Sequence, residues 1–165
     1  MEHKFSTRVK NLIYLIVGCA FLYACTSSTE DKEGRILFDT MKAMTEQTMA
    51  LHQDSGFLYA DSALRIIEKY SLGAKERMTV AGFKARLYTD LQQKDSAYHY
   101  LEMYYTLANE NDDSLAIGNY WLYRANLESQ RENLYVAEKF IVDAENILVR
   151  YGSKTALAQA YSIHG

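Results

Sequence analysis

The side chains best suited to chemistry are two cysteines near the N-terminus and one pair of histidine and glutamate. The chain of 165 residues has only two cysteines, Cys19 and Cys25, and a thiol is the most nucleophilic common side chain. His99 and Glu102 have the spacing of neighbours on one helix face, but two ligands are too few for a closed zinc site. Glycine-rich phosphate loops, His-Glu-x-x-His and Gly-x-Ser-x-Gly are absent from the sequence. We therefore expect no enzyme, no metal site and no cofactor, and the cysteines remain as sites of modification.

The cysteines lie in and directly after a predicted N-terminal leader over residues 1–24. Basic residues near the start precede an uncharged apolar run from Leu12 to Ala24, which is the profile of a secretory signal peptide. The run is shorter than the roughly 20 residues that a membrane-spanning helix needs. Polar and acidic residues follow, and they predict a flexible tether over residues 25–33.

The end of the leader, Leu22-Tyr23-Ala24-Cys25, resembles the lipobox of bacterial lipoproteins. The resemblance implies that Cys25 is alkylated by a diacylglyceryl group and becomes the acylated first residue, so that lipid such as palmitate tethers the protein to a membrane. Ile16-Val17-Gly18-Cys19 is a second match, so the choice between Cys19 and Cys25 stays open, as does an ordinary secretory leader. The implied location is the periplasm or cell surface of a bacterium, with the outer membrane favoured over the inner one.

The composition of the remaining chain indicates helices and disfavours nucleic acid as a partner. Proline is absent, as expected of a nearly all-helical chain, because proline breaks helices. The formal net charge of the whole chain is −3, and removal of the basic leader makes the mature chain more acidic. Phosphate contacts need clustered lysine and arginine, so we expect no nucleic-acid binding by this segment.

Apolar residues at helical spacing predict an all-α fold of antiparallel helices joined by short links. On the first helix the predicted apolar stripe is Leu37, Met41, Met44 and Leu51, which Thr48 interrupts. The expected helices cover about residues 33–53, 61–71, 75–92, 96–110, 114–131 and 134–151, and another begins near Lys154. The expected N-caps are Asp61-Ser62, Asp95 or Ser96, and Asp112 or Asp113, with Gly73 and Gly152 as left-handed residues after C-termini.

The sequence repeats itself with a spacing of 40 residues. Three series show this spacing: Ala81, Trp121 and Tyr161; Lys84, Arg124 and His164; and Ala85, Ala125 and Gly165. On the partner helices, Ala97 and Leu101 correspond to Ala137 and Ile141. Small residues at fixed places let helix backbones approach closely, so the predicted packing positions are Ala85, Ala97, Ala125, Ala137 and Gly165. Most of the 14 tyrosines are expected to fill gaps between stacked helices.

These positions resemble the tetratricopeptide (TPR) pattern of tryptophan, leucine-glycine, tyrosine, alanine and phenylalanine at fixed places. The chain departs from the pattern, since Lys84 and Arg124 replace the leucine, Glu128 replaces the tyrosine, and the period is longer. The resemblance implies a TPR-like α-solenoid over residues 34–165, truncated at the C-terminus because the last helix has no partner. Generic helix pairs remain the alternative.

In TPR arrays the first helix of each pair lines a concave groove. By that resemblance the groove residues here are Thr79, Arg86, Thr89, Asp90, Asn119, Leu122, Asn126, Ser129 and Gln130. Arg86 and Asn126 are equivalent in the repeat, and both could hydrogen-bond an extended peptide. The implied function is a membrane-anchored, extracytoplasmic scaffold for a protein or peptide, as the sensory or adaptor part of a regulatory system. The alternative is an outer-membrane nutrient-uptake or assembly lipoprotein that acts with a barrel partner.

Overall fold

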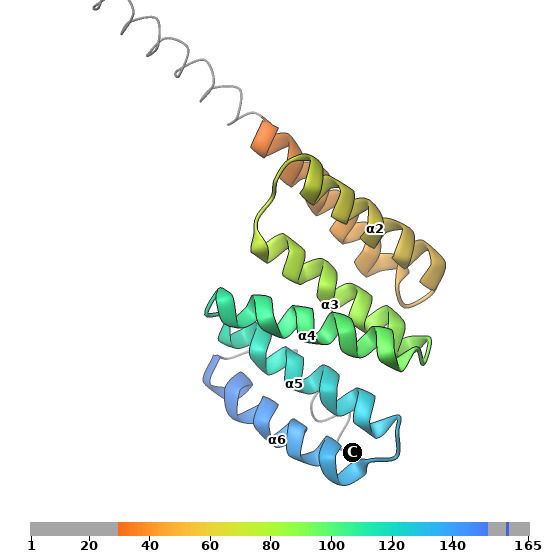
Figure 1. Cartoon of the computed structure of the whole chain (residues 1–165), viewed down its shortest axis with the longest axis vertical. Coiled ribbons are helices and arrows are strands. Elements are labelled where there is room, and N and C mark those ends of the chain that lie inside the picture. The colour runs from red at the N-terminus through yellow and green to blue at the C-terminus, as the bar shows by residue number, and fades with distance from the viewer. Residues whose placement is uncertain (1–29, 152–157, 159–165) are drawn as a thin grey trace, which may run out of the picture.

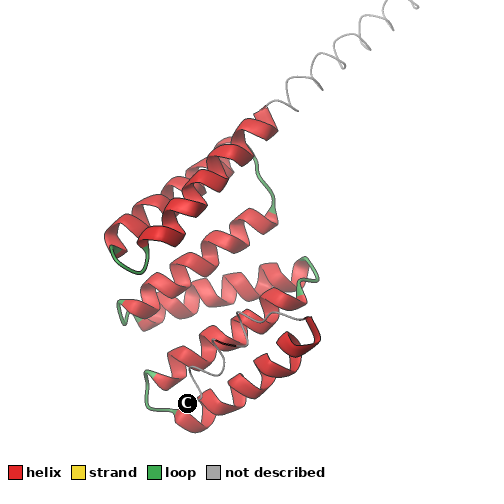
Figure 2. Ribbon diagram, turned by 180° about the vertical axis from the view of Figure 1, so that it is seen from behind, coloured by secondary structure: helices red, strands yellow, loops and turns green. Residues whose placement is uncertain are grey.

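The computed structural model describes residues 30–151 and Ala158, and these residues form a stack of helices (Figure 1). No strand occurs in this part of the chain. The loops lie alternately at the two ends of the stack, so successive helices run antiparallel (Figure 2). The predicted all-α class of neighbouring helix pairs is therefore confirmed. A first helix covers residues 30–48 and is followed by α2 (Gln53–Lys69), α3 (Ala74–Asp90), α4 (Lys94–Glu110), α5 (Ser114–Ser129) and α6 (Leu134–Tyr151).

The repeat period follows from helix connections of constant length. The helices α3 to α6 begin at Ala74, Lys94, Ser114 and Leu134, so each helix with its link takes 20 residues. Each of the four links between α2 and α6 passes through a non-glycine residue in the left-handed region: Ser71, Gln92, Asp112 and Glu132, with φ of 52°, 58°, 51° and 60°. At the third of these, the N–H of Asp113 donates to the carbonyl of Ala108 at 2.9 Å, and the other three links make the equivalent bond. This shared turn ends α2, α3, α4 and α5 without proline.

The predicted start of the second helix is wrong. α2 begins at Gln53 with His52 as its N-cap, and Asp61 and Ser62 lie inside it. Both side chains have other partners: Asp61 pairs with a lysine of α3, and the Ser62 hydroxyl donates to the Leu58 carbonyl at 2.8 Å. Polar residues that resemble an N-cap are thus stabilised within the helix.

Two other predicted helix ends are wrong, and one is confirmed. Gly73 has φ −78° and is the N-cap of α3, while Ser71 takes the left-handed position. The N-cap of α4 is Gln93 instead of Asp95 or Ser96. Asp113 is the N-cap of α5, and its carboxylate accepts from the N–H of Ala116 at 2.9 Å. The predicted end at Gly152 and the helix from Lys154 lie outside the described residues, apart from Ala158.

The first helix packs through a face that overlaps the predicted stripe only in part, because Met41 packs against the core but Leu37 and Leu51 are exposed. Its buried residues are Gly34, Phe38 and Thr45, and Met49 is buried directly after it, whereas Leu51 is 79% exposed. The buried Thr45 hydroxyl is satisfied because it donates to the Met41 carbonyl at 2.8 Å. A Cβ on Gly34 would lie 2.6 Å from Cβ of Tyr70, so glycine permits the close approach to this neighbour. This helix includes residues 30–33, the end of the predicted tether.

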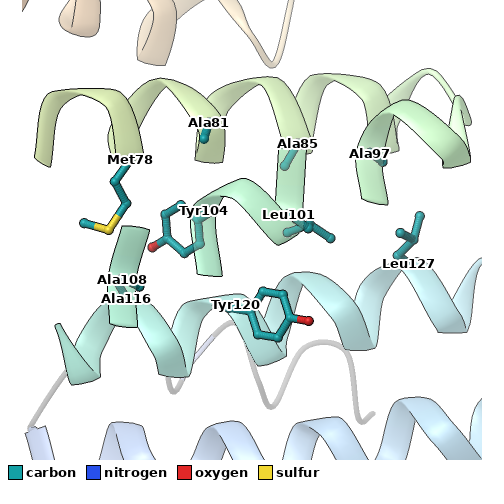
Figure 3. Close-up of a cluster of buried hydrophobic side chains, with 10 residues drawn as sticks. All are labelled: Met78, Ala81, Ala85, Ala97, Leu101, Tyr104, Ala108, Ala116, Tyr120 and Leu127. Atoms are coloured by element: carbon teal, nitrogen blue, oxygen red, sulfur yellow. The ribbon is translucent and has the colours of Figure 1, made fainter. Parts of the chain in front are cut away.

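A core between α3, α4 and α5 consists of small residues facing large ones (Figure 3). Ala85 of α3 and Ala97 of α4 are 1% and 0% exposed, which lets the two helices approach. Leu101 and Tyr104 of α4 fill the adjacent space. Gly82 also contributes, because a Cβ there would lie 3.1 Å from the Tyr104 ring.

The same arrangement joins α5 to α6. Ala125 of α5 and Ala137 of α6 are 0% and 3% exposed, and Ile141 and Leu148 fill the space between these helices. The four packing alanines within the described residues therefore occupy buried, equivalent places. Gly165, the fifth predicted packing position, lies outside the described residues.

Candidate functional site

The residues predicted to line a groove lie on α3 and α5, the first helices of their pairs. Arg86 and Asp90 are exposed on α3. On α5, Asn119 and Asn126 are half-buried, and Gln130 is exposed at the C-cap. Asn126 and Gln130 belong to the same turn, because the N–H of Gln130 donates to the Asn126 carbonyl at 3.1 Å.

Two further residues predicted for the groove are buried, and that part of the prediction is wrong. Thr89 is 3% exposed, and its hydroxyl donates to the Ala85 carbonyl at 2.8 Å. Leu122 is 2% exposed and packs in the core between α5 and α6. The first helix of each pair packs against its neighbours, so fewer of its residues face solvent than predicted. The other two predicted groove residues, Thr79 and Ser129, are half-buried.

Two tyrosines join the predicted residues of α3 and α5. The ring of Tyr104, from α4, lies 6.1 Å from that of Tyr123 between centroids. Burial raises the pKa of both phenols. Arg86 opposes the shift of the Tyr123 pKa, so its charge acts on this ring. The sequence contained one indication of the role of Tyr123, because Phe83, which lies 40 residues earlier at the repeat spacing, is also aromatic.

Asp90 adds an acidic group beside Arg86. Partial desolvation raises the pKa of the Asp90 carboxyl, and the charge of Arg86 opposes that shift. The two side chains are separated by four residues on α3, which places them on one face. The surface thus offers a cationic donor, an anionic acceptor and aromatic area, which are the groups needed to hold a peptide backbone and its side chains.

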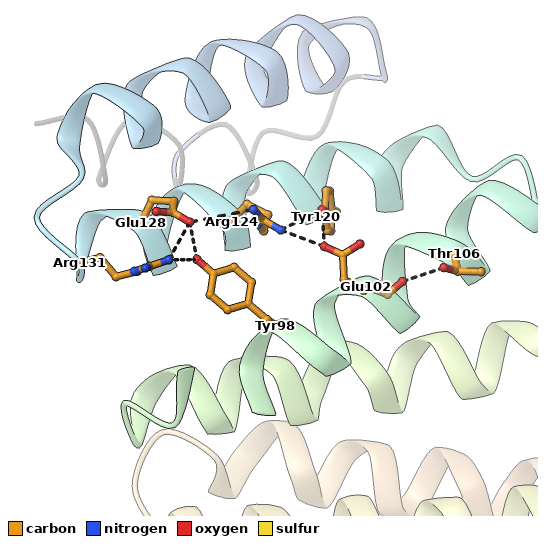
Figure 4. Close-up of polar contacts among 7 residues, drawn as sticks. All are labelled: Tyr98, Glu102, Thr106, Tyr120, Arg124, Glu128 and Arg131. Atoms are coloured by element: carbon orange, nitrogen blue, oxygen red, sulfur yellow. Dashed lines mark hydrogen bonds and ion pairs between the residues drawn. The ribbon is translucent and has the colours of Figure 1, made fainter. Parts of the chain in front are cut away.

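A second polar cluster lies at the junction of α4 and α5 and was not foreseen (Figure 4). Arg124 Nη1 lies 2.9 Å from Glu102 Oε1, and the Tyr120 hydroxyl donates to the same oxygen at 3.0 Å. Glu128 is only 5% exposed, and its carboxylate accepts from the Tyr98 hydroxyl. Burial, reinforced by the bond to Glu102, raises the pKa of Tyr120 to about 12.

An equivalent ion pair joins α2 to α3. Lys84 is 8% exposed, and its Nζ lies 2.6 Å from Asp61 Oδ1. Lys84 and Arg124 are the positions at which the chain departs from the TPR leucine, and each links its helix to the preceding one. The sequence indicated both ion pairs through the cations Lys84 and Arg124, which occupy equivalent places in the repeat. Glu102 is occupied by these contacts, and His99 is exposed beside the Tyr100 ring.

A separate cavity of about 480 Å³ lies between α2, α3 and α4. Its apolar lining includes Leu64, Val80 and Met103, and its charged lining residues are Arg77 and Glu110. An apolar cavity of this kind supplies contact area for a ligand.

The described residues define an all-helical protein of stacked helix pairs, an arrangement compatible with TPR-like repeats. Comparison with known protein families, curated proteins and solved structures gave no match. Every helix in residues 30–151 is too short or too polar to cross a bilayer. Cys19 and Cys25 lie outside the described residues.

Proposed function

We propose that this chain is a lipid-anchored TPR-like scaffold outside the cytoplasm, which binds a protein or an extended peptide along α3 and α5. It serves as the sensory or adaptor part of a regulatory system. The observation that supports this proposal is the exposed Arg86 and Asp90 beside Tyr123, on helices whose other faces are occupied by packing.

Arg86 is the principal binding residue in this proposal. Its guanidinium has five donors and suits a backbone carbonyl or a carboxylate of the partner. Asn126, at the equivalent place on α5, supplies both a donor and an acceptor. An extended peptide that crosses α3 and α5 satisfies its backbone groups at both residues, and Tyr123 gives apolar contact between them.

The binding proposal is tested with a peptide selected from a random displayed library against the full chain. The affinity of that peptide is then measured by calorimetry. A hydrogen bond to a charged group contributes roughly 1.5–3 kcal/mol, so we expect Arg86→Ala to weaken binding by about 10- to 100-fold. Asn126→Ala should weaken it less, because both partners are neutral.

Arg150→Ala is the matched control, because Arg150 is an exposed arginine on α6. This variant should bind the selected peptide like the unaltered chain, and circular dichroism should show equal helix content in all variants. Unchanged affinity in Arg86→Ala combined with Asn126→Ala, or an equal loss in Arg150→Ala, contradicts the proposed site.

The anchor is tested separately by labelling cells with radioactive palmitate. We expect label on the unaltered chain and on Cys19→Ser, no label on Cys25→Ser, and accumulation of the precursor when globomycin inhibits the signal peptidase. An unlabelled chain contradicts acylation, and loss of label in Cys19→Ser alone moves the modification to the other cysteine.

A further inference from the structure

The cavity between α2, α3 and α4 has the size of a small-molecule site. Its volume is about 480 Å³, and such sites occupy roughly 300–1,000 Å³. The buried Val80 and Ala81 of α3 form its floor. Leu64 of α2 lines it as well, and so do Tyr100 and Met103 of α4. The cavity thus lies between two neighbouring second helices, over the first helix that separates them.

The repeat identifies which residues occupy the same places between α4, α5 and α6. Leu64 corresponds to Tyr105, because each lies three residues after the carboxylate that pairs with a cation of the next helix. The correspondences at the repeat spacing are Val80 to Tyr120, Ala81 to Trp121 and Tyr100 to Phe140. Three of the four residues are therefore larger and aromatic in the second place, whereas Tyr100 is aromatic in both.

Between α4, α5 and α6 an indole ring fills this space. The ring of Trp121 stacks on Phe140 with centroids 5.2 Å apart, and it meets the edge of Tyr105 at 6.1 Å. Between α2, α3 and α4 the equivalent residue is Ala81, which has no ring, so the space between Leu64 and Tyr100 stays open. Aromatic rings pack well on tyrosine and on the sulfur of methionine, which favours an aromatic group as the occupant of the cavity.

One end of the cavity is charged. Arg77 lies near the start of α3 and Glu110 is the last residue of α4, so the antiparallel helices bring both residues to the same end. Both residues are exposed, and neither forms an ion pair with another side chain of residues 30–151. This end offers a cation for a carboxylate and a carboxylate for an ammonium group.

We propose that this cavity binds a free aromatic amino acid. The ring lies over Ala81 between Leu64 and Tyr100, the carboxylate pairs with Arg77, and the ammonium group pairs with Glu110. This site goes beyond the peptide surface proposed above and lies on another face of α3. Arg77 and Arg86 are nine residues apart, which places them about 180° apart around the helix axis.

The proposal is tested by calorimetric titration of the full chain with L-tryptophan. We expect one bound tryptophan per chain and no binding of L-alanine, which lacks the ring. N-acetyl-L-tryptophanamide has neither charge and imitates a tryptophan residue within a peptide. It should bind more weakly, by about 2- to 5-fold for each exposed charge pair that is lost. Equal or tighter binding of the amide assigns the cavity to a peptide side chain and overturns the proposal, as does no binding at millimolar tryptophan.

Two variants locate the bound tryptophan. Ala81→Trp copies the residue at the equivalent place on α5, fills the cavity and should abolish binding. Arg77→Ala should weaken binding by about 2- to 5-fold, whereas Arg65→Ala should not, because Arg65 is an exposed arginine of α2 outside the cavity lining.

Arg77→Ala changes an exposed side chain, so it decides the matter if circular dichroism shows that Ala81→Trp does not fold. Unchanged tryptophan binding in Arg77→Ala or in folded Ala81→Trp overturns the proposal, and so does an equal loss in Arg65→Ala. Arg77→Ala should bind the selected peptide like the unaltered chain, so failure at this cavity is distinct from failure of the peptide surface.

Discussion

Replacement of Gly118 by alanine tests the packing of α5 on α6 at one atom. The added Cβ would lie 2.8 Å from Cδ2 and 2.9 Å from Cγ of Leu148, which is 0% exposed. Carbon atoms are at their optimal separation near 3.5–4.0 Å, so the Leu148 side chain has to move by almost 1 Å in a closely packed core. Overpacking of this kind costs roughly 1–3 kcal/mol, while alanine gains about 1 kcal/mol of helix propensity over glycine. We expect a net loss of up to about 2 kcal/mol.

A double-mutant cycle separates the clash from the propensity. Leu148→Ala alone should cost about 2–5 kcal/mol. In that background Gly118→Ala should be close to neutral or stabilising, because the propensity gain is then opposed only by the 3.2 Å contact with Cγ2 of Ile147. The coupling free energy is then about 1–3 kcal/mol, measured by urea unfolding followed by circular dichroism. Gly73→Ala is the control, because its Cβ would meet only the flexible Glu76 carboxylate at 3.3 Å, and it should not couple to Leu148→Ala. A coupling below about 0.5 kcal/mol for Gly118 refutes the packing argument.

Three further predictions concern the turns and the junctions. Gln92→Gly should raise the free energy of unfolding by about 0.5–1 kcal/mol, because Gln92 has φ 58°; Gln93→Gly, at φ −84°, should not. Because the pKa of Tyr120 rises from 10.0 to about 12 on folding, the unfolded phenol ionises first and stability falls as pH rises through that window. Tyr120→Phe should remove up to about 2 kcal/mol of this fall in urea titrations, and an unchanged slope contradicts the assignment. Lys84→Leu should cost less than about 1 kcal/mol, because its partner carboxylate is 49% exposed and regains water. Arg124→Leu should cost roughly 2–3 kcal/mol, because it leaves a carboxylate whose side chain is only 6% exposed with one cation fewer, and the reverse order in thermal melts opposes this reasoning.

The repeat architecture of α3 to α6 could be predicted from sequence because two independent signals agree. Apolar spacing indicated helices, and small residues recurred at the repeat interval, as with Ala85 and Ala125. Burial of both residues at 1% and 0% exposure shows why the recurrence exists, since a larger side chain would separate the helices. The link length also contributes, because a turn of constant geometry keeps the two helices of a pair in register with the next pair.

The first helix and α2 were predicted less well because a local hydrophobic pattern does not show which groups their polar residues bond to or what their glycine packs against. Asp61 resembles an N-cap, yet its carboxylate binds Lys84 on the next helix. Thr45 is a buried polar residue that a hydrophobic pattern cannot place, since its hydroxyl bonds to its own helix. Gly34 is buried against Tyr70, a contact that no local pattern contains.

The candidate site illustrates the same limit on a single helix. Lys84 and Arg86 are both cations of α3, and they are two residues apart, which places them about 200° apart around the helix axis. Lys84 is 8% exposed and joins α3 to α2, whereas Arg86 is exposed beside Tyr123. Charge along the sequence does not distinguish these roles, but the repeat does. The residue at the repeat spacing from Lys84 is another cation, Arg124, which indicates that the junctions α2–α3 and α4–α5 are built alike. The residue at the repeat spacing from Arg86 is Asn126, which keeps a hydrogen-bonding group without the charge, and the proposed binding surface requires only the hydrogen bonding at this place.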